Sequence, residues 1–213
     1  MPSGKDLDAV TVDAMGTLVE LDDPVGRLSE ALRRWKVDRP REQVGAAFQG
    51  EVAYYLEHKL EARDAAGLAD LRQRCAAVFL QGVDADIDPA GFSPAFVDSM
   101  VFSPVDGAVP ALERIRAAGL SLACVSDWDI GLEEQLAKVG LDRLFETVLT
   151  SAEAGAPKPE PPIFEQALHR LGVQANRAVH VGDGEGDREG ASGVGMAFEP
   201  VPLATVPYRL GLR

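Results

Sequence analysis

The sequence predicts an α/β fold in which a parallel-sheet core carries an inserted all-helical segment, and three observations support this. A short apolar run that ends at Val12 is typical of a buried strand. From 24 to 101 the apolar residues recur at helical spacing, with no strand-like run between them. From about 105 onward, strand and helix patterns alternate, which indicates a parallel sheet with right-handed crossovers.

The elements of the inserted segment follow from local patterns. PVGRLSEALRRW opens with Pro in the first helical turn, and Phe48, Val52 and Tyr55 repeat at three to four residues. The segment is therefore expected to contain helices at 24–36, 40–63, 66–82 and 93–101.

The alternating part is expected to form strands and helices in the order helix 107–118, strand 120–125, helix 129–139, strand 146–149, helix 161–171, strand 178–182 and helix 187–193. The Pro-rich tail EPVPLATVPYRLGLR is expected to be an irregular cover with one short strand at most. These patterns predict a core made of 1–19 and 102–213, with 20–101 as a helical cap that forms a lid over the catalytic edge of the sheet.

The composition and charge of the chain limit the classes of molecule that it is expected to bind. The chain has 213 residues, of which 46% are hydrophobic and 26% charged, as is ordinary for a globular protein. Its net charge of −13 repels nucleic acid and anionic membrane surfaces, and no cluster of Lys and Arg offsets this. No apolar stretch approaches the roughly 20 residues that span a bilayer, and the polar start MPSGKDLD lacks a signal-peptide core. We expect a cytoplasmic protein with neither a nucleic-acid nor a membrane partner, in which Cys75 and Cys124 are packing residues.

Chemically useful side chains stand at the ends of the predicted strands. Asp13 closes the first strand, and Ser126 closes LSLACVS. Lys158 lies between prolines ahead of a helix, and AVHVGDGEGD carries Asp183 and Asp187. Ligands bind at the carboxyl ends of strands in open α/β sheets. Each residue alone is more typical of a cap, a turn or a solvated surface, but together they supply a nucleophile, a hydroxyl, an ammonium group and metal-binding carboxylates.

These four segments, in this order, resemble the four motifs of the haloacid dehalogenase (HAD) superfamily of aspartate-nucleophile hydrolases. The resemblance spans nearly the whole chain and implies a Rossmann-like core with a cap between the first and second motifs. It implies a covalent intermediate on Asp13 and a Mg²⁺ ion held by Asp13, Asp183 and the main-chain carbonyl of Met15. Asp187 follows Asp183 by four positions, where relatives with this cap more often show five, so it is a further ligand, a partner of a metal-bound water, or the N-cap of helix 187–193.

Other roles follow from residue chemistry beside the resemblance. Ser126 is expected to hydrogen-bond the oxygens of the transferred group, and Lys158 to neutralise charge on Asp13 and that group. The AMGT turn would add backbone N–H donors, aided by Gly16, and Thr17 would brace the loop.

Met15 is a departure from the resembled phosphatases, in which this position holds an Asp that protonates the leaving oxygen. Three explanations remain open. Another group replaces the Asp, either Asp127 or a cap residue from the set Tyr54, Tyr55, His58 and Arg63. Alternatively, the leaving group needs no proton, or hydrolysis has been lost and the domain binds a ligand or a partner protein.

Dehalogenases of the family also lack the second Asp, and their first motif often reads DAYGT, close to DAMGT here. They lack the acidic fourth motif, however, whereas this chain keeps Asp183 and Asp187. Clustered carboxylates without a cation repel one another, so the sequence favours Mg²⁺ and phosphoryl chemistry over dehalogenation. A cap lysine serves phosphonate cleavage elsewhere in the superfamily, but Lys59 fits a solvated helix face better.

The remaining expectations concern specificity. The cap set Tyr54, Tyr55, His58 and Arg63 suits a small anionic substrate, provided that it faces the core. The SDWD stretch places Trp128 at the pocket entrance or, as we favour, packed against the following helix. His180 is expected to be a packed sheet residue and His169 a solvated one. A monomer and a two-fold homodimer both fit the sequence.

Overall fold

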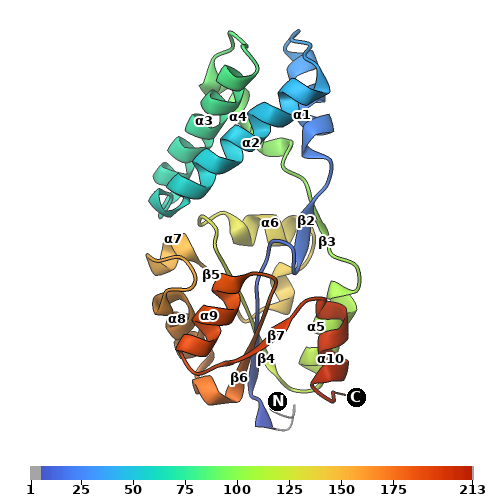
Figure 1. Cartoon of the computed structure of the whole chain (residues 1–213), viewed down its shortest axis with the longest axis vertical. Coiled ribbons are helices and arrows are strands. Elements are labelled where there is room, and N and C mark those ends of the chain that lie inside the picture. Colours follow the sequence, from blue (N-terminus) through green and yellow to red (C-terminus); the bar gives the residue numbers. More distant parts are fainter. Residues whose placement is uncertain (1–5, 213) are drawn as a thin grey trace. The chain divides into compact units, whose positions relative to one another are not determined.

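The computed structural model describes residues 6–212 and divides into two compact units (Figure 1). One unit, here called the α/β unit, comprises Met1–Glu20 and Ser103–Arg213. The other, the helical unit, comprises Leu21–Phe102.

A five-stranded parallel sheet forms the centre of the α/β unit, with the strand order β5-β4-β1-β6-β7. Its strands are β1 (Ala9–Val12), β4 (Ser121–Ser126), β5 (Thr147–Thr150), β6 (Ala178–Gly182) and β7 (Ala197–Pro200). All residues of β1 and β6 are buried, as expected for central strands covered on both faces. The predicted Rossmann-like α/β fold is thereby confirmed.

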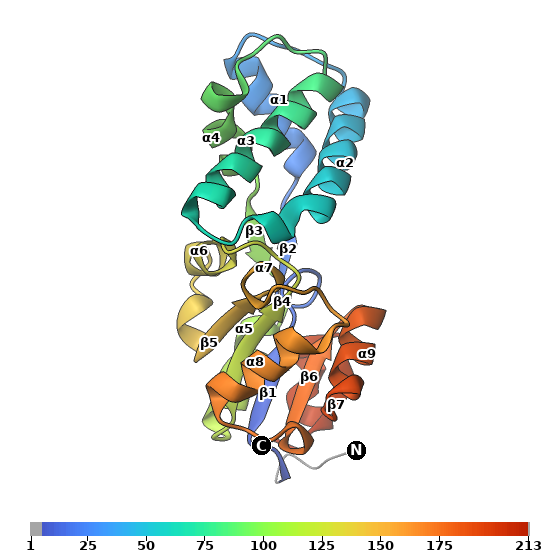
Figure 2. The same cartoon turned by 90° about the vertical axis from the view of Figure 1, so that its left-hand side faces the viewer.

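Helices cover both faces of this sheet, with α8 and α9 on one face and α5 on the other (Figures 1 and 2). The helices of the unit are α5 (Ala108–Ala117), α6 (Leu132–Lys138), α7 (Ser151–Ala154), α8 (Pro161–Leu171), α9 (Glu185–Gly193) and α10 (Val206–Arg209). Helix α8 begins with prolines in its first turn and ends at Gly172 in the left-handed conformation. Its buried Ile163 and Phe164 join the core formed with Ala123, Val125 and Leu149 of the sheet.

The sheet topology places β1 between β4 and β6, with Val12 beside Cys124 and Val181. The segments that follow these three parallel strands therefore emerge at one edge. A separate two-stranded sheet, β2 (Val19–Leu21) with β3 (Phe102–Pro104), lies where the chain leaves and re-enters the α/β unit.

The helical unit contains α1 (Pro24–Arg34), α2 (Arg41–His58), α3 (Ala65–Gly82) and α4 (Pro89–Asp98), with a 3₁₀ turn at Lys59–Glu61. Three of these helices start with an Asp cap whose carboxylate accepts a backbone N–H: Asp23 for α1, Asp64 for α3 and Asp88 for α4. The apolar core includes Phe79 and Phe92, whose rings stack with centroids 6.2 Å apart.

Several predicted boundaries are wrong, and capping explains them. Helix α4 begins at Pro89 rather than at 93, because Asp88 caps it and proline suits the first turn. Helix α6 begins at Leu132 rather than at 129, because the Asp129 carboxylate first closes a turn onto the Gly131 N–H at 2.6 Å. Helix α9 begins at Glu185 with Gly184 as its N-cap, so Asp187 is not the N-cap.

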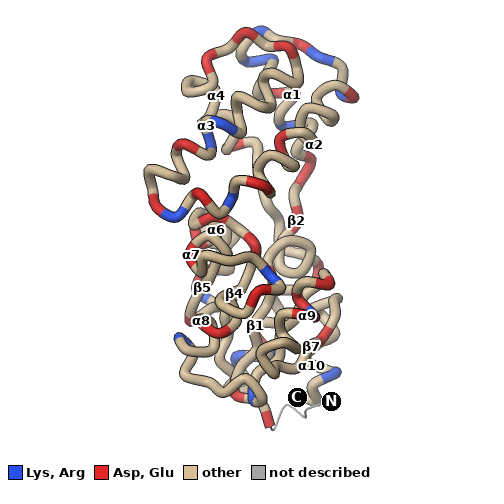
Figure 3. Tube along the Cα trace, turned by 60° about the vertical axis from the view of Figure 1, so that its left-hand side comes forward, with Lys and Arg blue, Asp and Glu red and all other residues tan. Residues whose placement is uncertain are grey.

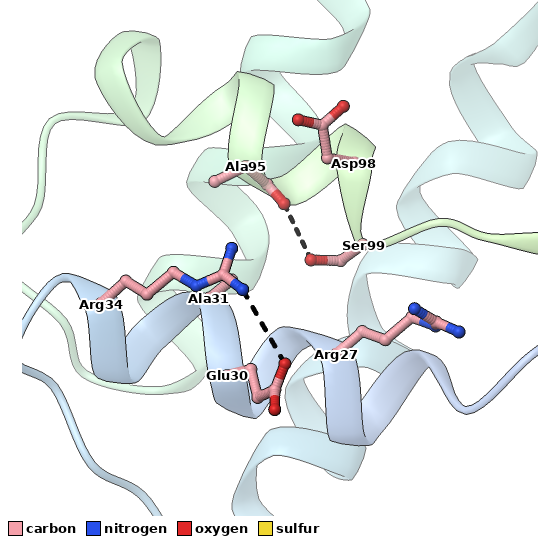
Figure 4. Close-up of a pocket in the computed structure, with 7 residues that line it drawn as sticks. All are labelled: Arg27, Glu30, Ala31, Arg34, Ala95, Asp98 and Ser99. Atoms are coloured by element: carbon pink, nitrogen blue, oxygen red, sulfur yellow. Dashed lines mark hydrogen bonds and ion pairs between the residues drawn. The ribbon is translucent and has the colours of Figure 1, made fainter.

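The surface of the helical unit has a pocket of about 150 Å³ between α1 and α4 (Figure 4). Its charged lining is already paired in part, since Arg27 lies 2.5 Å from Asp22 and Arg34 lies 4.0 Å from Glu30. Acidic residues are spread through both units (Figure 3). Among the described helices, none is long and apolar enough to cross a membrane.

Candidate active site

Asp13 directly follows β1, at the edge where the central strands end. Its N–H donates to the Val181 carbonyl at 2.9 Å, which ties the start of the loop to β6. The residue is 5% exposed, and Oδ1 accepts hydrogen bonds from Ser126 Oγ at 2.9 Å and from Lys158 Nζ at 2.6 Å. The structure thus brings together three of the predicted residues. Ser126 lies 113 positions after Asp13 in the chain, and Lys158 lies 145 positions after it.

The Lys158 ammonium group is surrounded by acceptors. Besides Asp13, Nζ donates to Asp187 Oδ1 at 2.5 Å and to the Val125 carbonyl at 3.4 Å. The backbone N–H of Lys158 donates to Asp127 Oδ1 at 2.9 Å. One contact of Asp127 is therefore structural, because it anchors the loop that presents Lys158.

Asp187, the third residue of α9, is the second buried carboxylate of the site. Its Oδ1 accepts from Lys158 and lies 2.8 Å from His180 Nε2, while Oδ2 accepts the Gly184 N–H at 3.0 Å. A Cβ added at Gly182 would lie 2.4 to 2.6 Å from the Asp187 side chain, so only glycine lets β6 pass this close.

Burial and charge act in opposite directions on these groups. Burial alone would lower the pKa of Lys158, but the Asp13 and Asp187 carboxylates raise it above its usual value. Burial would raise the pKa of Asp187, yet His180 and Lys158 hold it below its usual range. Burial raises the pKa of Asp13, an effect that Lys158 opposes and the neighbouring Asp187 carboxylate reinforces.

Asp13, Asp183 and Asp187 form an acidic cluster in which one carboxylate oxygen from each lies within 4.8 Å of the others. Asp183 is exposed, and its Oδ2 lies 2.5 Å from where a Cβ on Gly16 would stand. Gly16 also has a φ of +76°, so both its conformation and this close approach require glycine. Three hard oxygen donors at this spacing fit Mg²⁺, and Asp187 is the least available of them because Lys158, His180 and Gly184 already engage it.

Two amides of the loop after Asp13 are bonded within the loop itself. The Gly16 N–H donates to the Val19 carbonyl at 2.9 Å and the Thr17 N–H to the Ala14 carbonyl at 3.3 Å, so these amides are used within the loop. Thr17 is buried, but its hydroxyl has no hydrogen-bond partner among the described residues, so the expectation that it braces the loop is wrong for this group. The Met15 side chain is 39% exposed.

Trp128 lies in the loop after β4 and is buried. Its carbonyl accepts the Ala152 N–H at 3.2 Å and the Ser151 hydroxyl at 3.2 Å. Trp128 therefore ties this loop to α7.

The cap residues expected to contact substrate all belong to the helical unit. The Tyr54 hydroxyl accepts from Arg74 Nη1 at 2.7 Å, and His58 Nδ1 lies 2.8 Å from Glu61 Oε1. The Tyr54 and His58 rings have centroids 4.2 Å apart. Tyr55 is half-buried and Arg63 exposed. Lys59 is 7% exposed, so the expectation of a solvated lysine is wrong.

The sequence pattern does not single out Thr11 as a residue of the site, and it predicts only a packing role in the sheet for His180. His180 is fully buried in β6, as predicted, but its Nδ1 also lies 2.7 Å from Thr11 Oγ1. A signal for Thr11 exists, since it lies two residues before Asp13 in a strand and therefore on the same face of the sheet. The pairing of Thr11 with His180 depends on strand register.

Comparison with known proteins shows which family the chain resembles. A family model described as haloacid dehalogenase-like hydrolase matches residues 7–195. The chain is 43% identical over 102 residues to haloacid dehalogenase-like hydrolase domain-containing protein 3 of Bos taurus, a match that covers 47% of this chain and 41% of the bovine protein. It is 34% identical over 126 residues to the glyceraldehyde 3-phosphate phosphatase of Methanopyrus kandleri, covering 56% of this chain and 54% of that protein.

The chain thus spans about half the length of these curated relatives, 41% and 54%. Among solved structures, the 2-haloacid dehalogenase from Pseudomonas syringae pv. Tomato DC3000 is similar with a TM-score of 0.64 and 23% identity, covering 96% of this chain and 98% of that one. That likeness shows the fold alone. Because the family match spans most of its length, this chain belongs to the haloacid dehalogenase-like hydrolase family.

Proposed function

We propose that the protein is a Mg²⁺-dependent phosphatase or phosphotransferase that acts on a small-molecule phosphate through Asp13. The observation that carries the proposal is the hydrogen-bonding of Asp13 Oδ1 by Ser126 and Lys158 within the acidic cluster of Asp13, Asp183 and Asp187. Family membership and the similarity to a sugar-phosphate phosphatase support it. The net charge of −13 supports a small substrate over a polyanion.

The two donors on Oδ1 leave attack to Oδ2 of Asp13. In the first step a bond forms between Oδ2 and phosphorus while the bond to the leaving oxygen breaks, and the leaving group takes the electron pair. In the second step water attacks phosphorus, the bond to Oδ2 breaks and its electron pair restores the carboxylate, while one proton of the water passes to another oxygen of the released phosphate. Ser126 and Lys158 are positioned to stabilise charge on the transferred oxygens.

Asp13 and Asp183, with the Met15 carbonyl, would hold the cation, and Asp187 would act beside them through its contact with Lys158. A bound Mg²⁺ supplies positive charge that lets a carboxylate approach an anionic phosphoryl group. The excess of carboxylates over ammonium groups in the cluster supports this assignment, since Lys158 pairs with Asp13 and Asp187 and the carboxylate of Asp183 lies beside them.

Met15 limits the substrates that this site would process. General acid and base catalysis is typically worth about 10²–10⁴-fold, and a thioether can neither give nor take the proton. We therefore expect slow turnover of alkyl phosphates and faster transfer from compounds with leaving groups that need no proton, such as acyl or aryl phosphates.

Dehalogenation is the second candidate, because position 15 lacks a carboxylate. In that reaction Asp13 would form an ester with carbon while halide departs with its electron pair, and neither a proton donor nor a metal would be needed. The acidic cluster argues against it, since clustered carboxylates without a cation repel one another. A diverged role in binding, with no hydrolysis, is the third candidate.

Single-turnover mass spectrometry separates these candidates. The protein would be mixed with Mg²⁺ and with acetyl phosphate, an aryl phosphate, alkyl phosphates or 2-haloacids, with Asp13→Asn as the control. We expect a phosphate-sized adduct on Asp13 that requires Mg²⁺. An ester formed only from haloacid, without Mg²⁺, would establish dehalogenation, and the absence of any adduct would favour the non-hydrolytic role.

Restoring the missing acid tests the role of position 15. Met15→Asp should raise turnover of alkyl phosphates by up to about 10²-fold, with a smaller effect on acetyl phosphate. Met15→Leu keeps the bulk without the acid and should change neither rate. Equal acceleration of both substrate classes by Met15→Asp would contradict the assigned role.

A further inference from the structure

His180 lies in the middle of β6, beneath the acidic cluster, and is enclosed on all sides. It has no exposed surface, and the Phe164 ring meets it edge-on with centroids 5.1 Å apart at 89°. Phe198 lies on β7 with its ring centroid 6.5 Å from the imidazole. A polar ring in an apolar enclosure must satisfy both nitrogens locally or lose stability.

The two ring nitrogens have different partners. Nε2 lies 2.8 Å from Asp187 Oδ1, and Nδ1 lies 2.7 Å from Thr11 Oγ1. An ionised carboxylate can only accept, so Nε2 carries the proton and donates it to Asp187. Because a charged imidazole would be costly to bury among aromatic rings, Nδ1 is the unprotonated nitrogen and accepts from the Thr11 hydroxyl.

Strand register creates this arrangement. Thr11 and His180 are register partners on the adjacent parallel strands β1 and β6, so their side chains lie side by side on one face of the sheet. Asp13 lies two residues after Thr11 and shares that face. The same face therefore carries both the nucleophile and the threonine that donates to the unprotonated nitrogen of His180.

The contact with Asp187 extends to the reacting groups. Asp187 Oδ1 receives both His180 Nε2 and Lys158 Nζ, and Lys158 Nζ donates in turn to Asp13 Oδ1 at 2.6 Å. The Gly184 N–H holds the other oxygen of Asp187. These three donors fix the orientation of the Asp187 carboxylate. Loss of the His180 contact removes one of the two donors on Oδ1, so Asp187 can turn away from Lys158.

We propose that Thr11 and His180 are positioning residues: Thr11 donates to Nδ1 and so holds the His180 ring with its Nε2–H on Asp187, and His180 fixes Asp187 so that Lys158 points at Asp13. The kinetic consequence rests on the proposed function, whereas the tautomer and the hydrogen bond to Asp187 do not. A histidine that served only as packing would keep its effect on stability but would show no dependence on the hydroxyl of residue 11.

The tautomer is tested by nitrogen-detected NMR of the three histidine rings, with His180 assigned from the signal that is lost in His180→Phe. We expect a protonated Nε2 that exchanges slowly with water and an unprotonated Nδ1. Thr11→Val should leave Nδ1 without its donor and shift the Nδ1 resonance, and Thr11→Ser should restore it. A protonated Nδ1 in the wild type, or an unchanged signal in Thr11→Val, overturns the proposal even if no turnover is found.

Kinetics with acetyl phosphate test the consequence. Loss of partners that orient a site typically costs about 10- to 100-fold, so His180→Phe and Thr11→Val should lower kcat by that range with KM little changed. His180→Gln, whose amide can still donate to Asp187, and Thr11→Ser should recover most of the loss. The exposed His169→Gln is the matched control and should behave as wild type.

The variants also separate the two proposals. A folded Thr11→Val protein with wild-type kcat overturns the positioning role. If the wild type itself forms no adduct and releases no phosphate, the proposed function fails, and the NMR result alone then decides whether Thr11 and His180 hold Asp187.

Discussion

Each of the two units buries a carboxylate, but the pKa of one is lowered and the pKa of the other is raised. Asp187 in the α/β unit is 4% exposed and Glu51 in the helical unit is 5% exposed. Asp187 accepts from Lys158, His180 and a backbone N–H, and its pKa is held below the usual range. Burial raises the pKa of Glu51 to about 7, opposed by a hydrogen bond from the Cys75 thiol.

Equal burial therefore does not determine protonation. What decides it is the set of donors: an ammonium group, an imidazole and an amide keep Asp187 ionised, whereas Glu51, with only a thiol as donor, is about half protonated at pH 7. Buried ionic groups rarely add net stability, which suggests that the Asp187 cluster is retained for chemistry.

Among the variants that test this contrast between the two units, Lys158→Met should cause the largest loss of stability. Asp13 and Asp187 would then be buried without their shared cation, and removal of one partner from a buried ion pair costs about 3–5 kcal/mol. Urea unfolding followed by Trp128 fluorescence, in a Trp35→Phe background, would measure the change. Lys138→Met is the matched control, because Lys138 forms an exposed pair with Glu134 at 3.0 Å and its loss should cost at most about 1 kcal/mol. Equal effects of the two variants would refute the role assigned to the cluster.

Glu51→Gln should remove the pH dependence that Glu51 gives to the stability of the helical unit. The folded-state pKa of about 7 exceeds the ordinary glutamate pKa of 4.5, so the stability contributed by protonated Glu51 is full below pH 4.5 and is lost as pH rises through 7. The shift corresponds to about 3 kcal/mol between the two limits. Unfolding from pH 5 to 9, followed by Trp35 fluorescence in a Trp128→Phe background, should show this loss in the Glu51 protein and none in Glu51→Gln. The exposed Glu57→Gln is the control, and an unchanged pH profile in Glu51→Gln contradicts the expectation.

Adding Mg²⁺ should stabilise the α/β unit and leave the stability of the helical unit unchanged. At 100 times its Kd, a ligand that binds only the folded state contributes about 2.7 kcal/mol. The Trp128 transition should shift by about this amount, and the Trp35 transition should not. Asp183→Asn should reduce the shift, whereas Glu185→Gln, an exposed neighbour, should preserve it. A shift that survives Asp183→Asn would place the cation elsewhere.

Cys75→Ala should have the smallest effect. A neutral hydrogen bond contributes about 1 kcal/mol, so the loss of stability is modest. The thiol lowers the pKa of Glu51, so its removal should raise that pKa further and extend the pH-dependent loss of stability to higher pH. Cys75→Ser keeps a donor and should retain the original profile. A profile that moves to lower pH would show that the thiol does not stabilise the ionised form.

Apolar periodicity and the strand-end residues were sufficient to determine much of this protein. The predicted bounds of 161–171 for α8 and 178–182 for β6 coincide with those in the structure. Asp13, Ser126 and Lys158 meet because the carboxyl ends of parallel strands share one edge, which follows from the alternating pattern alone. Family membership follows from the same segments and their order.

Only the tertiary structure decided which polar groups hold one another. Thr11 and His180 are 169 positions apart, and their contact depends on the register between β1 and β6. Glu51 looks like any other polar residue of a helix until folding buries it beside Cys75 of α3. Local sequence determines strands and helices because their periods are short, whereas hydrogen-bond partners and pKa values depend on neighbours that the chain brings together only on folding.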